Sequence, residues 1–346
     1  VSIVGFDVVF AEPDSTSGLL VLEDLANKQL KGNRDYAATL DSLRGELDYD
    51  QRFAKTLKER LVVLGYYFNN DQGSRYGQLP QPVLARADVS GLPYSPFMSF
   101  QGYGANLPQF SASALQAHFN PIVDFDGVVR RVPLLVEFDG GYYEALSLAM
   151  VRLLQGGGTV LPGYPDGKPA NGIEWLEVIG KGEPRRVPVD DRVAALVPYI
   201  GEEKSFVYVS AVDVLRGKVP AEKLAGRIIL VGTTAPGLKD LRSTPVGANY
   251  PGVEIHANMI AGILDGTIKQ KPAYELGIDL PMLLFFGGLM VLLLPLLSPL
   301  RATLAAFAAV VTILLINFAL WSSASLVLPL ASLLLLTILL YAFNMT

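Results

Sequence analysis

Apolar residues dominate the end of the chain, where three hydrophobic runs follow one another with only short polar breaks between them. Each run has 20 residues, and together they cover 278–297, 302–321 and 324–343. At about 1.5 Å of rise per residue, each run would form about 30 Å of helix, which matches the hydrocarbon core of a bilayer. Asp279 and Arg301 are the only charged residues from 277 to 346. The pattern therefore predicts three transmembrane helices rather than a buried soluble bundle.

Before these runs, the pattern alternates between short buried strands and amphipathic helices. Nearly continuous β-branched and aromatic runs, typical of strands covered on both faces, occur at 1–10, 61–68 and 226–235. Apolar residues at three-to-four spacing favour helices within 17–64, 142–154 and 253–264. The alternation predicts an α/β fold, with a doubly wound, mostly parallel sheet and helices on both of its faces.

A β-hairpin interrupts this alternation at 117–137. The dipeptide Asp126-Gly127 is a hairpin-turn signal, and alternating apolar runs flank it on both sides. The second arm carries Arg130 and Arg131, which point to opposite faces of a strand. One arginine can therefore pair inward with Asp124 or another carboxylate, while the other faces solvent or a partner. A structural ion pair and a binding role both remain open.

Polar side chains follow the predicted strands at positions where α/β proteins often bind ligands. Asp7, Glu12 and Asp14 end the first strand, and Thr233 and Thr234 end the third. In open parallel sheets, the crevice beyond the carboxyl ends of the strands is the usual binding location. The polar loop after the third strand adds Asp240 and Arg242. Turn and capping chemistry is the alternative use of the three acidic residues.

The helix predicted at 253–264 stands close to the first apolar run, so it is the expected route for a signal. We expect its packed face to carry Val253, Ala257, Ile260, Ala261 and Leu264, with His256 one position off that face. The candidate signal-transmitting residues are His256, Asn258 and Leu264. Two histidines and no cysteine cannot form a His-rich or thiolate metal cluster, so we expect no metal site.

Composition and charge restrict the classes of function. The chain has 346 residues and a net charge of −5, without a basic run or a basic amphipathic helix. This argues against nucleic-acid binding and against binding to anionic lipid headgroups. The absence of cysteine means that disulfides do not hold the molecule together. The chain divides into a globular domain at 1–266, a linker at 267–276 and the three spans at 277–346.

Arg301 suggests how the spans are oriented. It is the basic residue of the short loops, so the positive-inside tendency places the first turn in the cytoplasm. Residues 1–277 are then extracytoplasmic, the C-terminus is cytoplasmic, and Asp279 lies at the outer boundary of the bilayer. We therefore expect a multi-pass protein of the plasma (inner) membrane. An odd number of crossings would put the globular domain and the C-terminus on opposite sides.

Three sequence landmarks give the chain a family resemblance. They are the GFDVVF run at 5–10 with Glu12-Pro13-Asp14, the DFDGVVRRVPL run at 124–134, and the stretch from GTTA at 232–235 to PGVEIHAN at 251–258. In this order the chain resembles a type-two CHASE domain, the extracytoplasmic sensory module associated with cyclases and histidine kinases, followed by its three usual spans. The resemblance implies an additional membrane segment before residue 1 and an effector after residue 346.

The resemblance also implies a function for the whole receptor. The effector would most often be a class III adenylate or guanylate cyclase, which makes cyclic nucleotide and uses Mg²⁺ or Mn²⁺ with ATP. A histidine or Ser/Thr kinase is the alternative effector. We expect no catalytic residue or cofactor in this chain, an unidentified extracytoplasmic ligand or protein as the stimulus, and a homodimer. A membrane-anchored hydrolase is disfavoured because the sequence has no GxSxG elbow, cysteine or histidine cluster.

Overall fold

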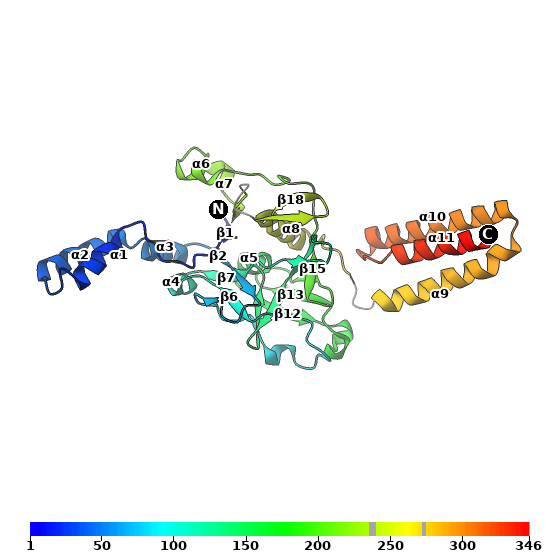
Figure 1. Ribbon diagram of the computed structural model, residues 1–346, viewed down its shortest axis with the longest axis horizontal. Coiled ribbons are helices and arrows are strands. Elements are labelled where there is room, and N and C mark those ends of the chain that lie inside the picture. The colour runs from blue at the N-terminus through cyan, green and yellow to red at the C-terminus, as the bar shows by residue number, and fades with distance from the viewer. Residues whose placement is uncertain (235–239, 272–274, 346) are drawn as a thin grey trace.

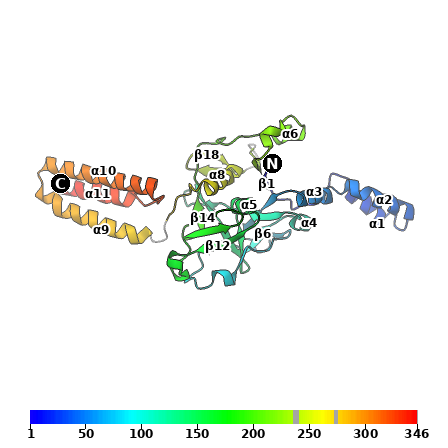
Figure 2. The ribbon, with the colours of Figure 1, turned by 180° about the vertical axis from the view of Figure 1, so that it is seen from behind.

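The computed structural model describes residues 1–234, 240–271 and 275–345. Figure 1 shows a central α/β domain, a helical arm on one side of it and a group of apolar helices on the other. The view from behind in Figure 2 shows the same arrangement. The arm and the apolar helices therefore extend from opposite ends of the central domain.

A parallel sheet lies at the centre of the domain and confirms the predicted fold class. Its parallel strands run in the order β16 (Ile228–Val231), β1 (Ile3–Phe6), β2 (Val62–Asn69) and β7 (Leu115–His118). The end of β2 continues into an antiparallel pairing with β6 (Gly102–Gly104), which in turn pairs with β3 (Arg75–Tyr76). The chain moves outward from β1 to β7 and then returns to the other side of β1, so the strand order reverses there.

Helices cover both faces of this sheet, as predicted, because alternate residues of β2 point in opposite directions. Val62 and Leu64 pack with α3 (Tyr49–Lys58) and with Phe110 of α4 (Pro108–Ser111). Val63 faces the other way, into the main core that includes Met150 and Met259. These two methionines belong to α5 (Leu146–Leu154) and α8 (Gly252–Asp265), which lie against each other.

The predicted strand at 226–235 forms, but it is neither as long nor as buried as expected. It is β16, which lies at the edge of the parallel sheet, and its residues are exposed or half-buried. Ala235 lies outside the described residues. Hydrophobic content identified the strand, but the sequence contains no local signal for its position within the sheet.

The predicted helix at 142–154 is wrong over its first four residues. Residues Gly141–Glu144 form β11, which pairs with β10 (Leu135–Phe138), and α5 begins only at Leu146. Asp139 and Gly140 connect the two strands with φ values of 47° and 80°. A two-residue turn with both φ values positive is the preferred hairpin connection, and Asp-Gly is one of its typical sequences. This turn signal outweighs the helical spacing of the residues that follow it.

Smaller sheets surround the central one. One four-stranded sheet joins β10 and β11 to β4 (Leu84–Ala85) and β5 (Met98–Ser99). The three other groups are β12–β13–β14 (Thr159–Gly163, Trp175–Ile179, Arg185–Pro188), β15–β9–β8 (Ala194–Leu196, Val129–Pro133, Ile122–Val123) and β17–β18 (Leu241–Thr244, Gly247–Pro251). The predicted hairpin is β8–β9, where Gly127 has φ 81° and its N–H donates to the Asp124 carbonyl at 2.9 Å.

The remaining helices of the domain are peripheral. The arm consists of α1 (Leu19–Asn27) and α2 (Arg34–Leu47), whose contact includes a hydrogen bond from the Tyr36 hydroxyl to the Leu22 carbonyl at 2.9 Å. Two short helices, α6 (Ala211–Leu215) and α7 (Ala221–Leu224), precede β16. Single turns of 3₁₀ helix occur at Arg86–Val89, Pro165–Gly167 and Pro169–Asn171.

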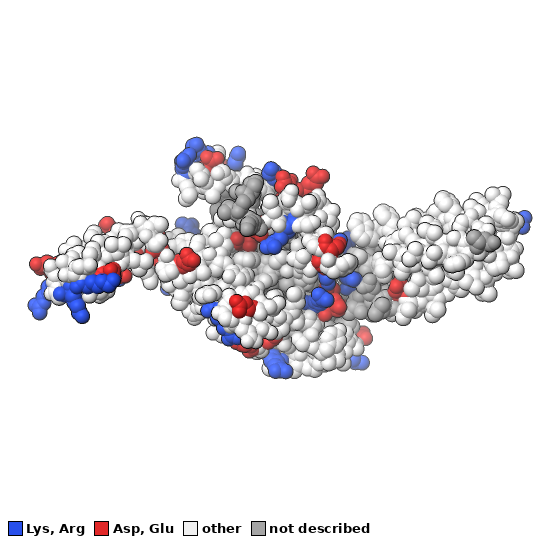
Figure 3. Space-filling view, viewed as in Figure 1, with Lys and Arg blue, Asp and Glu red and all other residues white. Residues whose placement is uncertain are grey.

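Two of the three predicted spans are long and apolar enough to cross a bilayer. The first covers Gly277–Leu296, which comprises all but the first two residues of α9 (Glu275–Leu293) and the 3₁₀ turn Leu294–Leu296. The second covers Pro299–Ser323, which is α10. Figure 3 shows that this end of the molecule carries very few charged side chains compared with the central domain. The first two predicted spans are therefore confirmed as apolar helices of membrane-spanning length.

The third predicted span differs from the structure. Helix α11 covers Ala331–Met345 and has 15 residues, fewer than the predicted 20, because it begins at residue 331 rather than 324. Ser325 has a positive φ of 56°, and Leu326 forms an isolated β-bridge with Gln270. Pro329 further disfavours helical geometry at the residue before it. Hydropathy alone does not detect this non-helical segment, because its residues are mostly apolar.

Candidate functional site

A crevice beyond the carboxyl ends of β1 and β7 brings together four of the predicted site residues. Its polar lining consists of Asp7, Asp240, Arg242 and His256, and the rest of its wall is Phe119, Pro121, Val132, Gly252 and Ile255. The cavity volume is about 20 Å³, enough for about one water-sized group. It lies next to the point where the strand order of the parallel sheet reverses, which is where open α/β sheets bind ligands.

Asp7 enters the crevice from the end of β1. Its backbone N–H donates to the Val231 carbonyl of β16 at 2.8 Å, so the parallel ladder fixes the position of this residue. Burial raises the pKa of its carboxyl group to about 6, and the nearby positive charge of Arg242 only partly opposes that rise. The shift is large although the side chain stays partly exposed, because the crevice walls displace most of its water.

Asp240 lies against the N-terminus of α8. Its backbone carbonyl accepts a hydrogen bond from the Gly252 N–H at 3.0 Å, and its carboxylate contacts Gly252 so closely that a Cβ there would come within 2.5 Å of Oδ2. Arg242 Nη2 is 3.3 Å from Asp240 Oδ1. Burial and the charge of Asp7 raise the pKa of Asp240, while Arg242 and His256 oppose that rise. Asp240 therefore occupies the end of α8 that would attract an anion.

His256 contributes a nitrogen without a partner. Its side chain is 4% exposed, and no described residue forms a hydrogen bond with Nδ1. Burial lowers the pKa of the ring to about 4, which the charge of Asp240 and a backbone hydrogen bond to Phe119 oppose. The ring is therefore neutral at pH 7. The expectation that His256 lies off the packed face of its helix was wrong, since the side chain is buried while Ala257, Ala261 and Leu264 are only half-buried.

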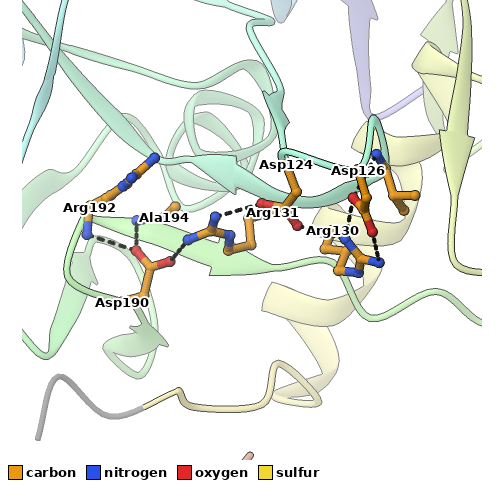
Figure 4. Close-up of polar contacts among 8 residues, drawn as sticks. Asp124, Asp126, Arg130, Arg131, Asp190, Arg192 and Ala194 are labelled. Carbon is orange, nitrogen blue, oxygen red and sulfur yellow. Dashed lines mark hydrogen bonds and ion pairs between the residues drawn. The ribbon is translucent and has the colours of Figure 1, made fainter. Parts of the chain in front are cut away.

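The hairpin residues form a separate ion-pair network, shown in Figure 4. Arg131 bridges two carboxylates, with Nη2 at 2.6 Å from Asp124 Oδ1 and Nη1 at 2.7 Å from Asp190 Oδ2. Arg130 pairs with Asp124 Oδ2 at 3.0 Å and contacts both oxygens of Asp126. Both arginines therefore pair with Asp124, whereas the sequence predicted one inward pair.

Burial and charge distinguish the two halves of this network. The side chain of Asp190 is 3% exposed and also accepts hydrogen bonds from the backbone N–H groups of Arg192 and Ala194. Although burial opposes it, hydrogen bonds from Arg131 and Arg130 lower the pKa of Asp124. A hydrogen bond from Arg130 lowers the pKa of the exposed Asp126 to about 2. The geometry is that of a structural clamp between β9 and the turn before β15.

The other predicted ligand candidates lie outside the crevice lining. Asp14 accepts hydrogen bonds from Thr16 and Ser17, which is turn chemistry, and Glu12 is exposed. Thr233 is half-buried and Thr234 is exposed just after β16. A ligand or interface role for these four residues stays a prediction.

The residues predicted to transmit a signal connect α8 to several parts of the domain. Asn258 donates to the Tyr250 hydroxyl at 2.8 Å, and its Oδ1 accepts a hydrogen bond from the Ile200 N–H at 3.0 Å. The carbonyl of Leu264, in the last turn of the helix, accepts a hydrogen bond from Arg185 Nη1 at 2.5 Å. Gly266 ends the helix in the left-handed region with φ 64°. Displacement of α8 would therefore disturb β18, β14 and the linker together.

The linker pairs with the loop between α10 and α11. The Gln270 N–H donates to the Ser325 carbonyl at 2.8 Å, and the Val327 N–H donates to the Gln270 carbonyl at 2.9 Å. Lys269 Nζ donates to the Trp321 carbonyl at 2.9 Å and lies 4.7 Å from the centre of the Trp321 ring. The end of the domain is thus bonded to α10 and to the loop before α11, and it also leads into α9.

Sequence reasoning missed three buried polar groups that organise the domain. Glu144 forms an ion pair with Arg152, and Glu254 accepts a hydrogen bond from the Tyr208 hydroxyl at 2.6 Å. Asp190 forms an ion pair with Arg131 of the hairpin network. Asp190 lies 59 residues from Arg131, so local spacing gives no signal of the contact. The nearby acidic-basic run at 190–192 marks a turn but does not show that the first aspartate is buried. The described residues contain no group of three His, Cys, Asp or Glu side chains placed to bind a metal ion.

Comparisons with known proteins agree with the sequence landmarks. The family model described as the CHASE2 domain matches residues 1–295, which include the parallel sheet, the crevice and most of the first apolar helix. Searches of curated proteins and of solved structures gave no match. The family match covers well over half of the chain, so the protein belongs to the CHASE2 domain family.

Proposed function

We propose that this chain is the extracytoplasmic sensor and the membrane portion of a receptor that controls a cytoplasmic class III adenylate or guanylate cyclase. The CHASE2 match and the apolar helices support a membrane receptor with a sensor domain. The cyclase is inferred from the family resemblance, which associates such sensors most often with this effector. A histidine or Ser/Thr kinase as the effector would use the same sensor.

The observation that carries this proposal is the continuous connection from the crevice to the apolar helices. His256 lines the crevice from α8, and Gly266 ends the same helix. Four residues later, Gln270 is bonded to the α10–α11 loop. A ligand that prefers one position of α8 would therefore shift the equilibrium between two arrangements of the apolar helices.

The crevice gives little support to a hydrolase. Its described lining contains no serine, threonine, cysteine or lysine that could act as a nucleophile beside His256. Binding and displacement of α8 are chemically simpler uses of the same residues. The catalytic requirements of a cyclase, including Mg²⁺ or Mn²⁺ with ATP, would be met by a cytoplasmic domain after residue 346.

The proposal requires the domain and the C-terminus to lie on opposite sides of the membrane. Because the chain has no cysteine, single cysteines introduced as Glu12→Cys and Arg301→Cys can be labelled separately. Both positions are exposed. A membrane-impermeant maleimide added to intact cells should label the first variant and leave the second unlabelled until the cells are lysed. Labelling of Arg301→Cys in intact cells would contradict this orientation.

The effector is tested with the complete protein in membranes of cells that lack their own cyclases. We expect cyclic nucleotide formation from ATP or GTP with Mg²⁺ or Mn²⁺. ATP-dependent phosphotransfer without cyclic nucleotide would show a kinase instead and refute the cyclase.

Transmission through the linker is tested by inserting Gly-Ser-Gly-Ser after Gly266. The matched control places the same insertion after Gly217, an exposed left-handed glycine with open space around it, far from the linker. The insertion after Gly266 should change the output of the effector, because the linker would no longer hold a fixed length. Equal output from both insertions would contradict this route.

A further inference from the structure

Two of the described polar groups of the crevice, the Asp7 carboxylate and His256 Nδ1, are hydrogen-bond acceptors without a donor among the described residues. No described side chain or backbone group donates a hydrogen bond to the Asp7 carboxylate, although Arg242 lies near enough to affect its charge. Asp240 accepts from Arg242, the one cationic side chain of the described lining. Buried acceptors that lack donors are costly, so a site of this kind favours a ligand that supplies N–H or O–H groups.

His256 adds a third acceptor. Its Nδ1 has no partner among the described residues, so the backbone hydrogen bond to Phe119 assigns the proton of the neutral ring to Nε2. Nδ1 then carries a lone pair without a partner, and the ring lines the crevice. Because His256 is only 4% exposed, bulk solvent does not satisfy this nitrogen.

The charges of the crevice favour a cation. With Asp7 and Asp240 ionised, one arginine and a neutral histidine leave the described lining with one net negative charge. An anion would meet two carboxylates, and Asp240 already occupies the N-terminus of α8. A metal ion is disfavoured, since no described group of three ligands is placed to hold one.

We propose that the crevice binds a small organic cation through a primary ammonium group, whose three N–H donors bond to Asp7, Asp240 and His256 Nδ1. This inference rests on the proposed sensor function for its biological meaning, because the ligand would be the stimulus. Binding itself does not require an effector. A quaternary ammonium ion carries the same charge but no N–H donor, and Phe119 is the single aromatic residue in the described lining, so the crevice offers no aromatic cage.

The pH dependence of binding follows from the same geometry. Among the described residues, the charged and titratable groups that line the crevice with Asp7 are Asp240 and Arg242 from the β17 segment and His256 from α8. Asp7 must be ionised to accept the ammonium group, and burial raises the pKa of its carboxyl group to about 6. Affinity should therefore fall about tenfold between about pH 7.5 and pH 5.

The test uses the chain in lipid nanodiscs with ¹⁵N-labelled histidine. The sequence has two histidines, so the spectrum is simple to assign. Methylammonium chloride should shift the His256 Nδ1 resonance in a saturable manner, whereas tetramethylammonium chloride should not. Asp7→Asn should weaken methylammonium binding at least tenfold. The matched control Asp14→Asn, which removes an acidic group after the same strand but outside the crevice, should bind as the parent does.

Several results would overturn the proposal. An equal shift with tetramethylammonium would show that charge alone is recognised, and saturation by CaCl₂ but not by methylammonium would show a metal site. The absence of any saturable shift would also reject it. If Asp7→Asn does not fold, the expected loss of affinity at low pH in the unaltered chain tests the same carboxylate. No effector is present in these measurements. A negative result would therefore reject ammonium binding in the crevice without testing whether the receptor controls a cyclase.

Discussion

The two adjacent arginines of β9 allow a sharp test of what the hairpin network does. We expect Arg131→Met to destabilise the domain strongly and Arg130→Met to have a much smaller effect. The side chain of Arg131 is 17% exposed and connects Asp124 to the buried Asp190, while Arg130 is 40% exposed. The two substitutions are chemically identical and one residue apart, so each is the control for the other.

The magnitude follows from what Asp190 keeps after the substitution. Removing one partner from a buried ion pair costs about 3–5 kcal/mol, because the remaining charge is left without compensation. Asp190 would keep two backbone donors, at 2.9 Å from Arg192 and 3.0 Å from Ala194, and Asp124 would keep Arg130. We therefore expect the lower end of that range, about 3 kcal/mol. In Arg130→Met, by contrast, water can solvate the exposed Asp126.

Urea unfolding of the chain in detergent micelles provides the measurement. The chain has two tryptophans, so a Trp321→Phe background leaves Trp175 of β13 as the fluorescent reporter of the domain. With a denaturant slope of about 3 kcal/mol per molar, Arg131→Met should lower the midpoint by about 1 M. Equal midpoints for Arg131→Met and Arg130→Met would refute this explanation and reopen a binding role for Arg131.

Three further predictions concern pH and the linker. The folded-state pKa of Asp7, about 6, lies above its usual value of 3.8, so its contribution to stability is full below about pH 4 and is lost as the pH rises through 6. Asp7→Asn should therefore be more stable than the parent at pH 7.5, by about 1–2 kcal/mol. Unfolding midpoints of the two proteins, measured between about pH 4 and pH 7.5, provide the check. The contribution of His118 to stability changes with pH in the opposite direction. Because burial lowers the folded-state pKa of His118 to about 3, its protonation destabilises the fold as the pH falls below about 6.5. His118→Leu should lose less stability than the parent between pH 7 and pH 4, and equal losses would reject this assignment. Finally, Gln270→Cys with Leu326→Cys should form a disulfide readily, since the two residues are bridge partners, and a gel shift that only reductant reverses would show it.

The sequence predicted the parts of the fold that depend on local patterns. Nearly continuous apolar runs located β1 and β2, apolar residues at three-to-four spacing located α8, and the Asp126-Gly127 pair located the hairpin. The equivalent Asp139-Gly140 pair was overlooked because the next residues also fit a helix. Span length was overestimated for α11, since hydropathy does not detect a non-helical segment made of apolar residues.

The candidate site was predicted only as separate residues. Asp7 was predicted because it follows a strand, and Asp240 and Arg242 were predicted because they lie in a polar loop. No local pattern showed that the three residues share one crevice. The His256 ring is hydrogen-bonded to the backbone of Phe119, which lies more than 130 residues earlier in the chain. Partners at such separations are set by how the sheet and helices pack, which a single sequence does not encode in its spacing.

The bridge between Gln270 and the α10–α11 loop has a mechanical consequence. Both the N–H and the carbonyl of Gln270 are bonded across this contact, so the linker cannot slide without moving Ser325 and Val327. Those residues join α10 to α11, whereas α9 is reached through the chain itself. A movement of the linker would therefore reach the helical group at two points at once, through α9 along the chain and through the α10–α11 loop, and α11 packs against both of the other helices.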